Sequence, residues 1–410
     1  MRILVVQESD WIEKGPHQSH HLMERLNARG HAVKIIDFEI LWKNHGKQSV
    51  FSKRRIFRDI HKAIPDGGVT VVRPSIIRLP LIDYLSLLIT HRREIRRQLE
   101  EFKPDIIVGF GILNANLALR FARKKRIPFV YYIIDELHRL VPQKALRGIA
   151  RRIEMANMEG SDLVISINDA LRDYTISMGA RRENTSIIKA GIDIERFNLQ
   201  IDKTAIRRSL NISENDLVLF FMGWLYKFSG LTELTEELRR NPKKYGELRL
   251  LIIGKGELWD YLVNARNGDL KEKMILLNWQ PYEKIPAFIA ASDICILPAQ
   301  RNEIMQNIVP IKMYEYMAMA KPIIATDLKG LRMEFGEENG VMYIERPEQA
   351  LTLAFNLKRE ARIEKEGAKA RKFVEHNDWE TIGDQFEAEL KALISKRRML
   401  SHSSLELSCS

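Results

Sequence analysis

Residues 293–326 read DICILPAQRNEIMQNIVPIKMYEYMAMAKPIIAT, and this stretch carries the most structural information in the chain. It begins with a continuous apolar run that ends at Pro298, crosses a polar loop, and reaches a second apolar run over Lys321–Ala325. Pro310 stands where a helix between the two runs would begin, because its fixed φ suits a first helical turn. The order strand, loop, helix, strand predicts a parallel β-α-β unit, since continuous apolar strands are typical of sheets covered on both faces.

The same unit recurs along both halves of the chain. In the first half, strands are predicted at Ile3–Val6, Ala32–Ile36, Val69–Val72, Asp105–Gly109, Pro128–Ile134, Asp162–Ile167 and Ser186–Lys189. In the second half, they are predicted at Leu217–Met222, Leu248–Ile253, Lys273–Leu277, Asp293–Leu297 and Lys321–Ala325. Helical stretches separate the strands, such as His17–Arg29 ahead of Gly30. The repetition predicts an α/β fold made of two Rossmann-like, doubly wound domains.

Polar segments set the expected domain boundaries. We expect an N-terminal domain over residues 1–198 and a C-terminal domain over residues 199–375, with Asn198–Asp216 as a polar linker. Residues 376–395 are predicted to form a helix that packs back on the first domain. Residues 396–410 are predicted to form a flexible tail.

Composition excludes several classes of protein. The chain has 410 residues, of which 45% are hydrophobic and 29% charged, so it is expected to fold rather than to remain disordered. Its two cysteines exclude a disulfide scaffold and favour a reducing compartment. The sequence contains no apolar run long enough for a transmembrane helix and no secretory signal, which predicts a cytoplasmic protein. The formal charge of +11 favours an anionic partner.

Three glycine-containing turns follow predicted strands and are candidates for binding an anion. Two are Gly-x-Gly turns, at Gly109–Gly111 and Gly254–Gly256, where backbone amides and a helix N-terminus can approach a phosphate. Neither completes a dinucleotide-binding fingerprint, and each is more simply explained as a plain turn. The third, Gly223–Gly230 (GWLYKFSG), joins a strand to a helix, and its Lys227 either binds a diphosphate or faces solvent.

Lys312 and Glu315 lie three residues apart on the helix predicted after Pro310. At that spacing they share a helix face, so the two side chains by themselves are explained by an ordinary surface ion pair. The alternative is a binding site, and it is favoured only if motifs elsewhere in the sequence also indicate one.

Short motifs are spaced across nearly the whole chain. They include RGHAV at Arg29–Val33, KPDI at Lys103–Ile106, SDLVIS at Ser161–Ser166, GIDIERF at Gly191–Phe197 and the run Glu315–Thr326. Their order resembles that of the retaining, nucleotide-sugar-dependent glycosyltransferases of the glycogen-synthase-like, or group 1, family. The resemblance implies the GT-B fold, in which two Rossmann-like domains face a cleft. It also implies transfer of a sugar from a nucleotide diphosphate sugar to a glycan or lipid-linked acceptor, with no metal cofactor.

The resemblance assigns a donor site to the C-terminal domain. A family variant with the pattern N-x-x-P-x-K-x-x-E-Y is matched by Asn307, Pro310, Lys312, Glu315 and Tyr316. Glu315 would accept hydrogen bonds from the ribose diol, and Asn307 would face the sugar. Lys227 and Lys312 would stabilise the charge that grows on the leaving diphosphate. The predicted donor site is completed by Gly223, Ser229, Gly230, Gly254 and Gly256.

The chain departs from the family pattern at three positions of the donor segment and donor loop. Asn307 replaces the first of two glutamates, and Trp224 and Ser229 replace the arginine and lysine of the donor loop. These departures leave open which donor is used and whether activity is reduced. A non-hydrolysing sugar-nucleotide epimerase and a catalytically silent nucleotide-binding relative are therefore kept as alternatives.

In the N-terminal domain, polar residues follow two predicted strands. Gly15 and His17 belong to the loop after the first strand, which the resemblance places beside the acceptor and the diphosphate. Asp135 and His138 follow the strand at Pro128–Ile134, and either could position an acceptor hydroxyl; helix capping by Asp135 is the alternative. His17 and His21 share a helix face, but we expect no metal there.

Positive charge concentrates in the N-terminal domain. Arg92, Arg93, Arg96 and Arg97 crowd one predicted helix, whose apolar stripe of Leu81, Leu85, Leu88, Ile95, Leu99 and Phe102 is expected to face the core. One-sign clustering on an amphipathic helix is typical of proteins that bind anionic membrane surfaces, so peripheral attachment is a hypothesis. Nucleic-acid binding is not predicted, because no recognition motif accompanies the charge.

Overall fold

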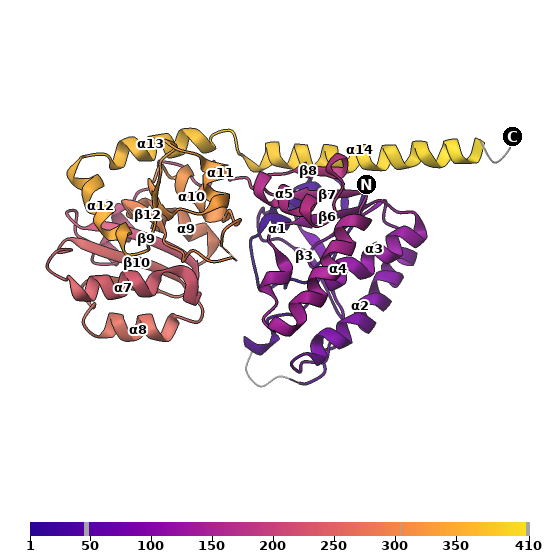
Figure 1. The fold of residues 1–410 in the computed structure, drawn as a ribbon, viewed down its shortest axis with the longest axis horizontal. Helices are drawn as coiled ribbons and strands as arrows, with labels where there is room; N and C mark the ends of the chain where they lie inside the picture. The colour runs from indigo at the N-terminus through magenta and orange to yellow at the C-terminus, as the bar shows by residue number, and fades with distance from the viewer. Residues whose placement is uncertain (45–48, 304, 407–410) are drawn as a thin grey trace. The chain divides into compact units, whose positions relative to one another are not determined.

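The computed structural model describes residues 1–44, 49–303 and 305–406 (Figure 1). The chain divides into two compact units. Unit 1 contains residues 1–190 together with the chain from Trp379 onward, and unit 2 contains Gly191–Asp378. The stretch Asn198–Asp216, expected as a linker, belongs to unit 2 and contains helix α6 (Thr204–Ser209).

Unit 1 is built on an eight-stranded sheet with the order β3-β4-β2-β1-β5-β6-β7-β8. Its strands are β1 (Arg2–Val6), β2 (Ala32–Ile36), β3 (Arg55–Ile60), β4 (Val69–Arg73), β5 (Ile106–Gly109), β6 (Phe129–Ile133), β7 (Leu163–Ser166) and β8 (Thr185–Ile187). Neighbouring strands are parallel except β3 and β4, which are antiparallel. The helices are α1 (Gln18–Ala28), α2 (Ile82–Glu101), α3 (Leu113–Lys125), α4 (Arg147–Gly160), α5 (Asp169–Ser177) and α14 (Trp379–Glu406).

Unit 2 is built on a six-stranded, fully parallel sheet with the order β11-β10-β9-β12-β13-β14. Its strands are β9 (Leu217–Trp224), β10 (Leu248–Lys255), β11 (Met274–Leu277), β12 (Ile294–Leu297), β13 (Ile323–Thr326) and β14 (Val341–Ile344). Besides α6, its helices are α7 (Leu231–Arg240), α8 (Trp259–Asn267), α9 (Ile285–Ala291), α10 (Ile311–Ala318), α11 (Lys329–Phe335), α12 (Gln349–Arg359) and α13 (Ile363–Val374). Two parallel-sheet units of this kind confirm the predicted fold class.

Two strands were not predicted from the sequence. Strand β3, RIFRDI, is largely exposed on both faces, so it has neither a continuous apolar run nor a regular alternation. Strand β14, VMYI, is a short strand at the sheet edge, following Gly340 with its φ of 76°. Most of the predicted strands, by contrast, are nearly continuous apolar runs, and the observed ones agree with them to within one or two residues.

Helices α2 and α14 differ from expectation. On α2, Ile95 and Leu99 are buried as predicted, but Leu81, Leu85 and Leu88 are exposed, so the apolar stripe faces the core only in its second half. Helix α14 continues through residues 396–406, part of the predicted tail, because no glycine or proline interrupts it after Gly383; residues 407–410 lie outside the described residues. None of the helices described has the length and apolarity needed to cross a membrane.

Candidate active site

In unit 2, the predicted donor residues gather at the carboxyl edge of the sheet. Strand β9 leads into the Gly223–Gly230 loop, and its neighbour β10 leads into the Gly254–Gly256 turn. Gly254 pairs with Gly223 across the two strands, and a Cβ at 254 would lie 2.0 Å from the carbonyl oxygen of Gly223. Gly256 has a φ of 150° and lies against the backbone of Leu225. The two loops are therefore held together by contacts that only glycine permits.

The Gly223–Gly230 loop closes against the segment that follows β12. Gly230 has a φ of 77°, and a Cβ there would lie 1.7 Å from the carbonyl oxygen of Pro298. Three amides of the loop already have partners: Leu225 donates to the carbonyl of Lys255, Lys227 to the Glu257 carboxylate, and Ser229 to the carbonyl of Tyr226. Fewer backbone amides of this loop are therefore available to bind an anion than expected, because these three donors are engaged within the described chain.

Lys312 and Glu315 point to different partners rather than forming a surface pair. The Nζ of Lys312 donates to the carbonyl oxygen of Met222 at 2.9 Å and lies 4.4 Å from the centre of the Phe221 ring. Desolvation lowers the pKa of Lys312 to about 8, and the charge of Glu315 partly opposes that shift. A Cβ at Gly223 would lie 3.0 Å from Nζ, so the missing side chain at 223 leaves the ammonium room at the end of β9.

Glu315 is almost fully buried, with 5% of the residue exposed. Its Oε1 accepts a hydrogen bond from the hydroxyl of Tyr282 at 2.8 Å. Burial raises the pKa of Glu315 to about 7, while that hydrogen bond and the charges of Lys312 and Arg196 act to lower it. A buried carboxylate poised near neutrality can accept hydroxyl donors that enter the site.

The structure places four further predicted donor residues in different environments: Asn307, Pro310, Ser229 and Lys227. Pro310 is the N-cap of α10, in agreement with its predicted place at the helix start. Asn307 is half-buried, and its backbone packs on Gly330, where a Cβ would lie 2.7 Å from the Asn307 carbonyl carbon. Ser229 is buried, whereas the side chain of Lys227 is exposed. Of the two predicted cations, Lys312 is the one built into the strand ends.

An aromatic cluster with a lysine lies at the same edge of the sheet. Trp224 stands at the end of β9, and its ring centre is 6.3 Å from that of the exposed Trp279, which follows β11. Lys255, at the end of β10, places Nζ 5.4 Å from the Trp224 ring centre and 5.9 Å from that of Trp279. A cation is therefore present beside Trp224, the residue that replaces the expected arginine.

In unit 1, a buried ion cluster holds the loop after β1. Arg73 donates to Asp10 and Asp37 at 2.5 Å each, and both carboxylates are fully buried. Asp37 also accepts from the amide of Trp11, and Asp10 from the amides of Ile12 and Glu13. These contacts fix the loop that leads to Gly15 and His17.

The predicted residues of unit 1 separate into a loop cluster and a buried network. Gly15 has a φ of 106° and packs on the ring of His20, whose Nδ1 accepts from the amide of the exposed His17. Burial raises the pKa of Asp135 to about 7, and the nearby charge of Lys14 acts to lower it. Lys14 lies in the same loop as Gly15 and His17, and its charge acts on Asp135. The loop and Asp135, both predicted from the sequence, are therefore linked by an electrostatic interaction.

His138 lies in the buried network. Its Nδ1 is 2.8 Å from Oε2 of the buried Glu154 and 3.1 Å from the hydroxyl of Tyr174. These contacts connect the turn after β6 to α4 and α5. The Nδ1 atom of His138, which was predicted to act on the acceptor, therefore takes part in structural contacts. His21 stacks on Trp379 of α14, with ring centres 4.2 Å apart, rather than pairing with His17.

The Gly109–Gly111 turn holds a side chain of its own unit. The carboxylate of Glu8 accepts from the amide of Asn114 at 2.7 Å, and a Cβ at Gly111 would lie 2.9 Å from the Glu8 Cβ. Burial raises the pKa of Glu8 to about 7. Glu8 therefore fills the place at the start of α3 that an external anion would take.

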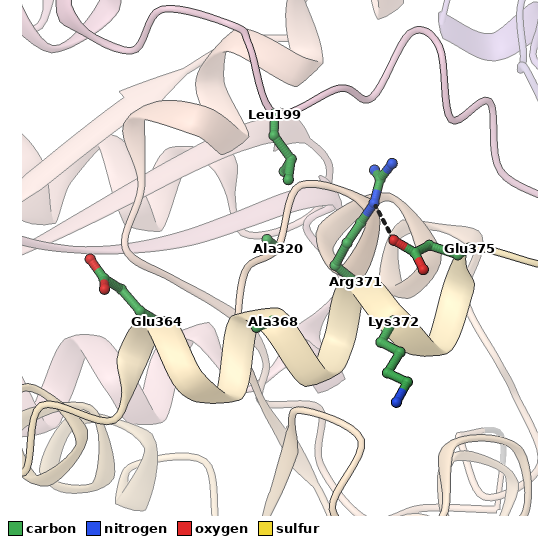
Figure 2. A pocket seen from close by; sticks show the side chains of 7 residues that line it. All are labelled: Leu199, Ala320, Glu364, Ala368, Arg371, Lys372 and Glu375. Carbon is green, nitrogen blue, oxygen red and sulfur yellow. Dashed lines mark ion pairs between the residues drawn. The ribbon is translucent and has the colours of Figure 1, made fainter.

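A cavity of about 300 Å³ opens beside α13, away from these residues (Figure 2). Ala320, which lines it, precedes β13, so the cavity lies at the amino edge of the sheet, opposite the strand ends that carry the donor residues. Figure 2 shows Arg371 of its lining paired with Glu375. The two charged groups lie 3.7 Å apart. Arg371 also donates to the carbonyl of Phe197. These are contacts that stabilise unit 2.

Comparison with known proteins identifies the class of enzyme. Residues 202–375 match the family model described as glycosyl transferases group 1, and residues 16–191 match the glycosyl transferase 4-like domain. The chain is a glycosyltransferase, and its residues 202–375 are similar to the group 1 family. The resemblance drawn from the motifs is thereby confirmed at this level, and the chain is an enzyme; retention and the variant donor motif remain predictions.

Relatives of this glycosyltransferase include enzymes named for the synthesis of surface polysaccharides. It is 22% identical over 331 residues to the putative teichuronic acid biosynthesis glycosyltransferase TuaC of Bacillus subtilis (strain 168), covering 78% of this chain and 77% of TuaC. It is 27% identical over 174 residues to the amylovoran biosynthesis glycosyltransferase AmsK of Erwinia amylovora, covering 42% of this chain and 40% of AmsK. The aligned part thus spans less than half the length of AmsK.

Solved structures of other glycosyltransferases share the fold. HepE of Anabaena, in complex with UDP, superposes with a TM-score of 0.71 at 17% identity, covering 96% of this chain and 100% of HepE. Sucrose-phosphate synthase from Thermosynechococcus elongatus superposes with a TM-score of 0.74 at 17% identity, covering 97% of this chain and 100% of the synthase. At these identities the likeness shows the fold, which is GT-B.

Sequence reasoning missed Tyr282, Lys255 and Lys14. Each follows or ends a strand at the carboxyl edge of a sheet, the edge where ligands bind in open α/β folds. Position at that edge was the signal available for them. Their partners lie far away along the chain, and no spacing rule connects such positions.

Proposed function

We propose that this glycosyltransferase moves a sugar from a nucleotide diphosphate sugar, bound by unit 2, to a hydroxyl group of a glycan or lipid-linked acceptor, bound by unit 1. The arrangement of Lys312 and Glu315 on α10 carries the proposal. One buried carboxylate and one ammonium at the carboxyl edge of a parallel sheet suit a ribose diol and a diphosphate.

The chemistry follows from where charge develops. When the anomeric C–O bond of the donor breaks, negative charge grows on the departing diphosphate. The ammonium of Lys312 would stabilise that charge more in the transition state than in the ground state, because it is held in a partly desolvated position. Lys255 adds a second cation at the same edge. Retention of anomeric configuration is proposed from the family resemblance alone.

Uridine nucleotides are the first donors to test, because HepE was solved with UDP and with UDP-glucose. A relative named UDP-Gal:alpha-D-GlcNAc-diphosphoundecaprenol alpha-1,3-galactosyltransferase, from Escherichia coli, is 25% identical over 250 residues, with 57% of this chain and 60% of that enzyme covered. We therefore propose a diphosphate-linked lipid saccharide as the acceptor class.

The test is transfer itself. The enzyme is incubated with UDP-sugars and lipid-linked saccharide acceptors, and release of UDP and formation of a larger saccharide lipid are measured together. UDP release that requires the acceptor, with a retained anomer by NMR, is expected. Conversion of the sugar nucleotide without an acceptor would instead identify an epimerase, and inversion would refute retention.

The exposed face of α2 supports attachment to an anionic membrane. Ile82, Leu85 and Ile89 recur at helical spacing and are exposed, with 62% of Leu85 and 56% of Ile89 accessible. The exposed Arg92 and Arg96 continue the same face toward the end of the helix. Apolar side chains beside basic ones bind interfaces that combine acyl chains with anionic head groups, at about 1 kcal/mol per cation near the surface.

Vesicle flotation tests this attachment. Binding to vesicles of phosphatidylcholine with phosphatidylglycerol is expected to exceed binding to phosphatidylcholine alone and to fall in L85E/I89E. Met333→Glu in unit 2, where the methionine is also exposed, is the matched control and should leave flotation unchanged. Equal binding to both kinds of vesicle would exclude the anionic surface.

A further inference from the structure

We propose that Tyr282 is a positioning residue for the donor: its hydroxyl holds the Glu315 carboxylate in place, and the Gly191–Phe197 segment holds the tyrosine ring. The inference rests on the proposed function, because it assigns Glu315 to the ribose of the nucleotide. It also gives a structural task to the GIDIERF motif, which the proposed chemistry leaves unexplained.

The hydrogen bond from Tyr282 connects two elements that are distant in sequence. Tyr282 opens the 3-10 turn η6 (Tyr282–Lys284) between β11 and α9, whereas Glu315 lies in the middle of α10. The hydroxyl reaches Oε1 at 2.8 Å. Burial and the neighbouring carboxylate raise the pKa of Tyr282 well above its usual value, so the phenol keeps its proton and donates at all physiological pH values.

The ring of Tyr282 is enclosed by the first residues of unit 2. The guanidinium of Arg196 lies 5.0 Å from the ring centre, and the ring of the fully buried Phe197 lies 5.8 Å away at 59°. Arg196 is itself held by Asp193, which accepts from its amide at 3.0 Å and lies 3.5 Å from its Nε. The cation over the Tyr282 ring and the tilted contact from the Phe197 ring restrict the tyrosine to this orientation.

This arrangement fixes one oxygen of the carboxylate and leaves the other for a ligand. A carboxylate has about four acceptor positions, and the tyrosine uses one of them on Oε1. The charged and titratable groups that act on Glu315 are Tyr282, Lys312 and Arg196, and all three favour its ionised form. Without the tyrosine hydroxyl, the carboxyl group would take up a proton more readily and would be free to rotate.

The experiment measures nucleotide affinity by calorimetry between pH 5.5 and 9 in the full-length protein. The ligands are UDP, GDP and ADP and, for the one that binds, its 2′-deoxy counterpart. In Tyr282→Phe, affinity for the ribonucleotide is expected to fall about tenfold at pH 7, the loss typical of a hydrogen bond to a charged group. The acidic limb of the affinity profile is expected to move to higher pH, and discrimination against the 2′-deoxynucleotide is expected to weaken.

Tyr314→Phe is the matched control. Tyr314 is the neighbour of Glu315 on α10, and its hydroxyl donates to a buried glutamate, Glu334, at 2.7 Å. The substitution therefore removes the same kind of bond from the same helix without touching Glu315. Its affinity and pH profile should match those of the wild type, and thermal denaturation checks that both variants are folded.

Three outcomes are decisive. The inference is supported if Tyr282→Phe shifts the acidic limb and Tyr314→Phe does not, with Arg196→Gln giving a smaller shift in the same direction as Tyr282→Phe. It is overturned if Tyr282→Phe binds like the wild type while Glu315→Gln binds weakly, a result that leaves the proposed function intact. If the wild type binds none of the three diphosphates, the donor site itself is refuted and the inference falls with it.

Discussion

The buried ion cluster of unit 1 offers a stability prediction that can be worked from the structure. Arg73 is the one partner shared by Asp10 and Asp37 in the described cluster, and it approaches each at 2.5 Å. Arg73→Met keeps much of the side-chain volume and removes the charge. Two buried carboxylates then lose their cation, and the loop that carries Gly15 and His17 loses its anchor.

The expected magnitude is large for a single substitution. Removing one partner of a buried ion pair costs about 3–5 kcal/mol, because the remaining charge stays desolvated. For a domain of this size, 1 kcal/mol corresponds to about 2–4 °C in Tm, so a drop of about 10 °C is expected. Arg55→Met is the matched control: Arg55 pairs with Glu39 at 2.7 Å but is itself exposed, so its loss should cost at most about 1 kcal/mol.

The dependence on pH separates this account from a simple packing defect. Burial already raises the pKa of Asp37 to about 6 with Arg73 present, and removing the arginine should raise it further. A carboxyl group whose pKa is raised on folding destabilises the protein as pH rises through that pKa. The deficit of Arg73→Met, measured by urea denaturation, should therefore be larger at pH 8 than at pH 5. A loss below about 1 kcal/mol at pH 8, or a deficit independent of pH, would refute the reasoning.

Three further predictions concern the donor site. Gly230→Ala should weaken nucleotide binding and lower Tm, because the new Cβ would collide with the Pro298 carbonyl oxygen 1.7 Å away; calorimetry and thermal denaturation check both. Affinity for the bound nucleotide sugar should be greatest between pH 7 and 8, since Glu315 ionises above a pKa of about 7 and Lys312 loses its proton above a pKa of about 8. Lys312→Met should remove the alkaline limb of that profile and weaken the nucleoside diphosphate more than the nucleoside, about tenfold, as measured by competition binding.

The sequence predicted those elements whose signal lies within one short stretch of residues, and it missed those that depend on contacts with distant residues. Runs such as LVLFFM and IIAT are apolar on every residue, so a strand buried on both faces is the simplest explanation, and β9 and β13 lie where predicted. Strand β3 carries arginines and an aspartate on exposed positions, and it is recognised only through its pairing with β4. In the first half of α2, Leu85 and Leu88 were expected to face the core, yet both are exposed because nothing in the described chain covers them, whereas Leu87 is buried.

The candidate site shows the same division. Lys312, Glu315 and Pro310 were found because they stand in one motif on one helix, where spacing fixes their relation. The contact between Tyr282 and Glu315 joins residues 33 positions apart through a turn, and the contact between Glu8 and Asn114 joins residues 106 apart. Only the folded chain brings such pairs together. For the same reason, the partners that engage the loop amides and His138 were not foreseen.

The central claim is that Glu315 and the strand ends of unit 2 bind a nucleoside diphosphate, and calorimetry tests it most directly. UDP, GDP, ADP, TDP and CMP are titrated into the wild type and into Glu315→Gln, which preserves the size of the side chain and removes its charge. The account predicts that one diphosphate binds and that its affinity falls at least tenfold in the variant. Absence of binding by every nucleotide, or equal affinity in the two proteins, would contradict it.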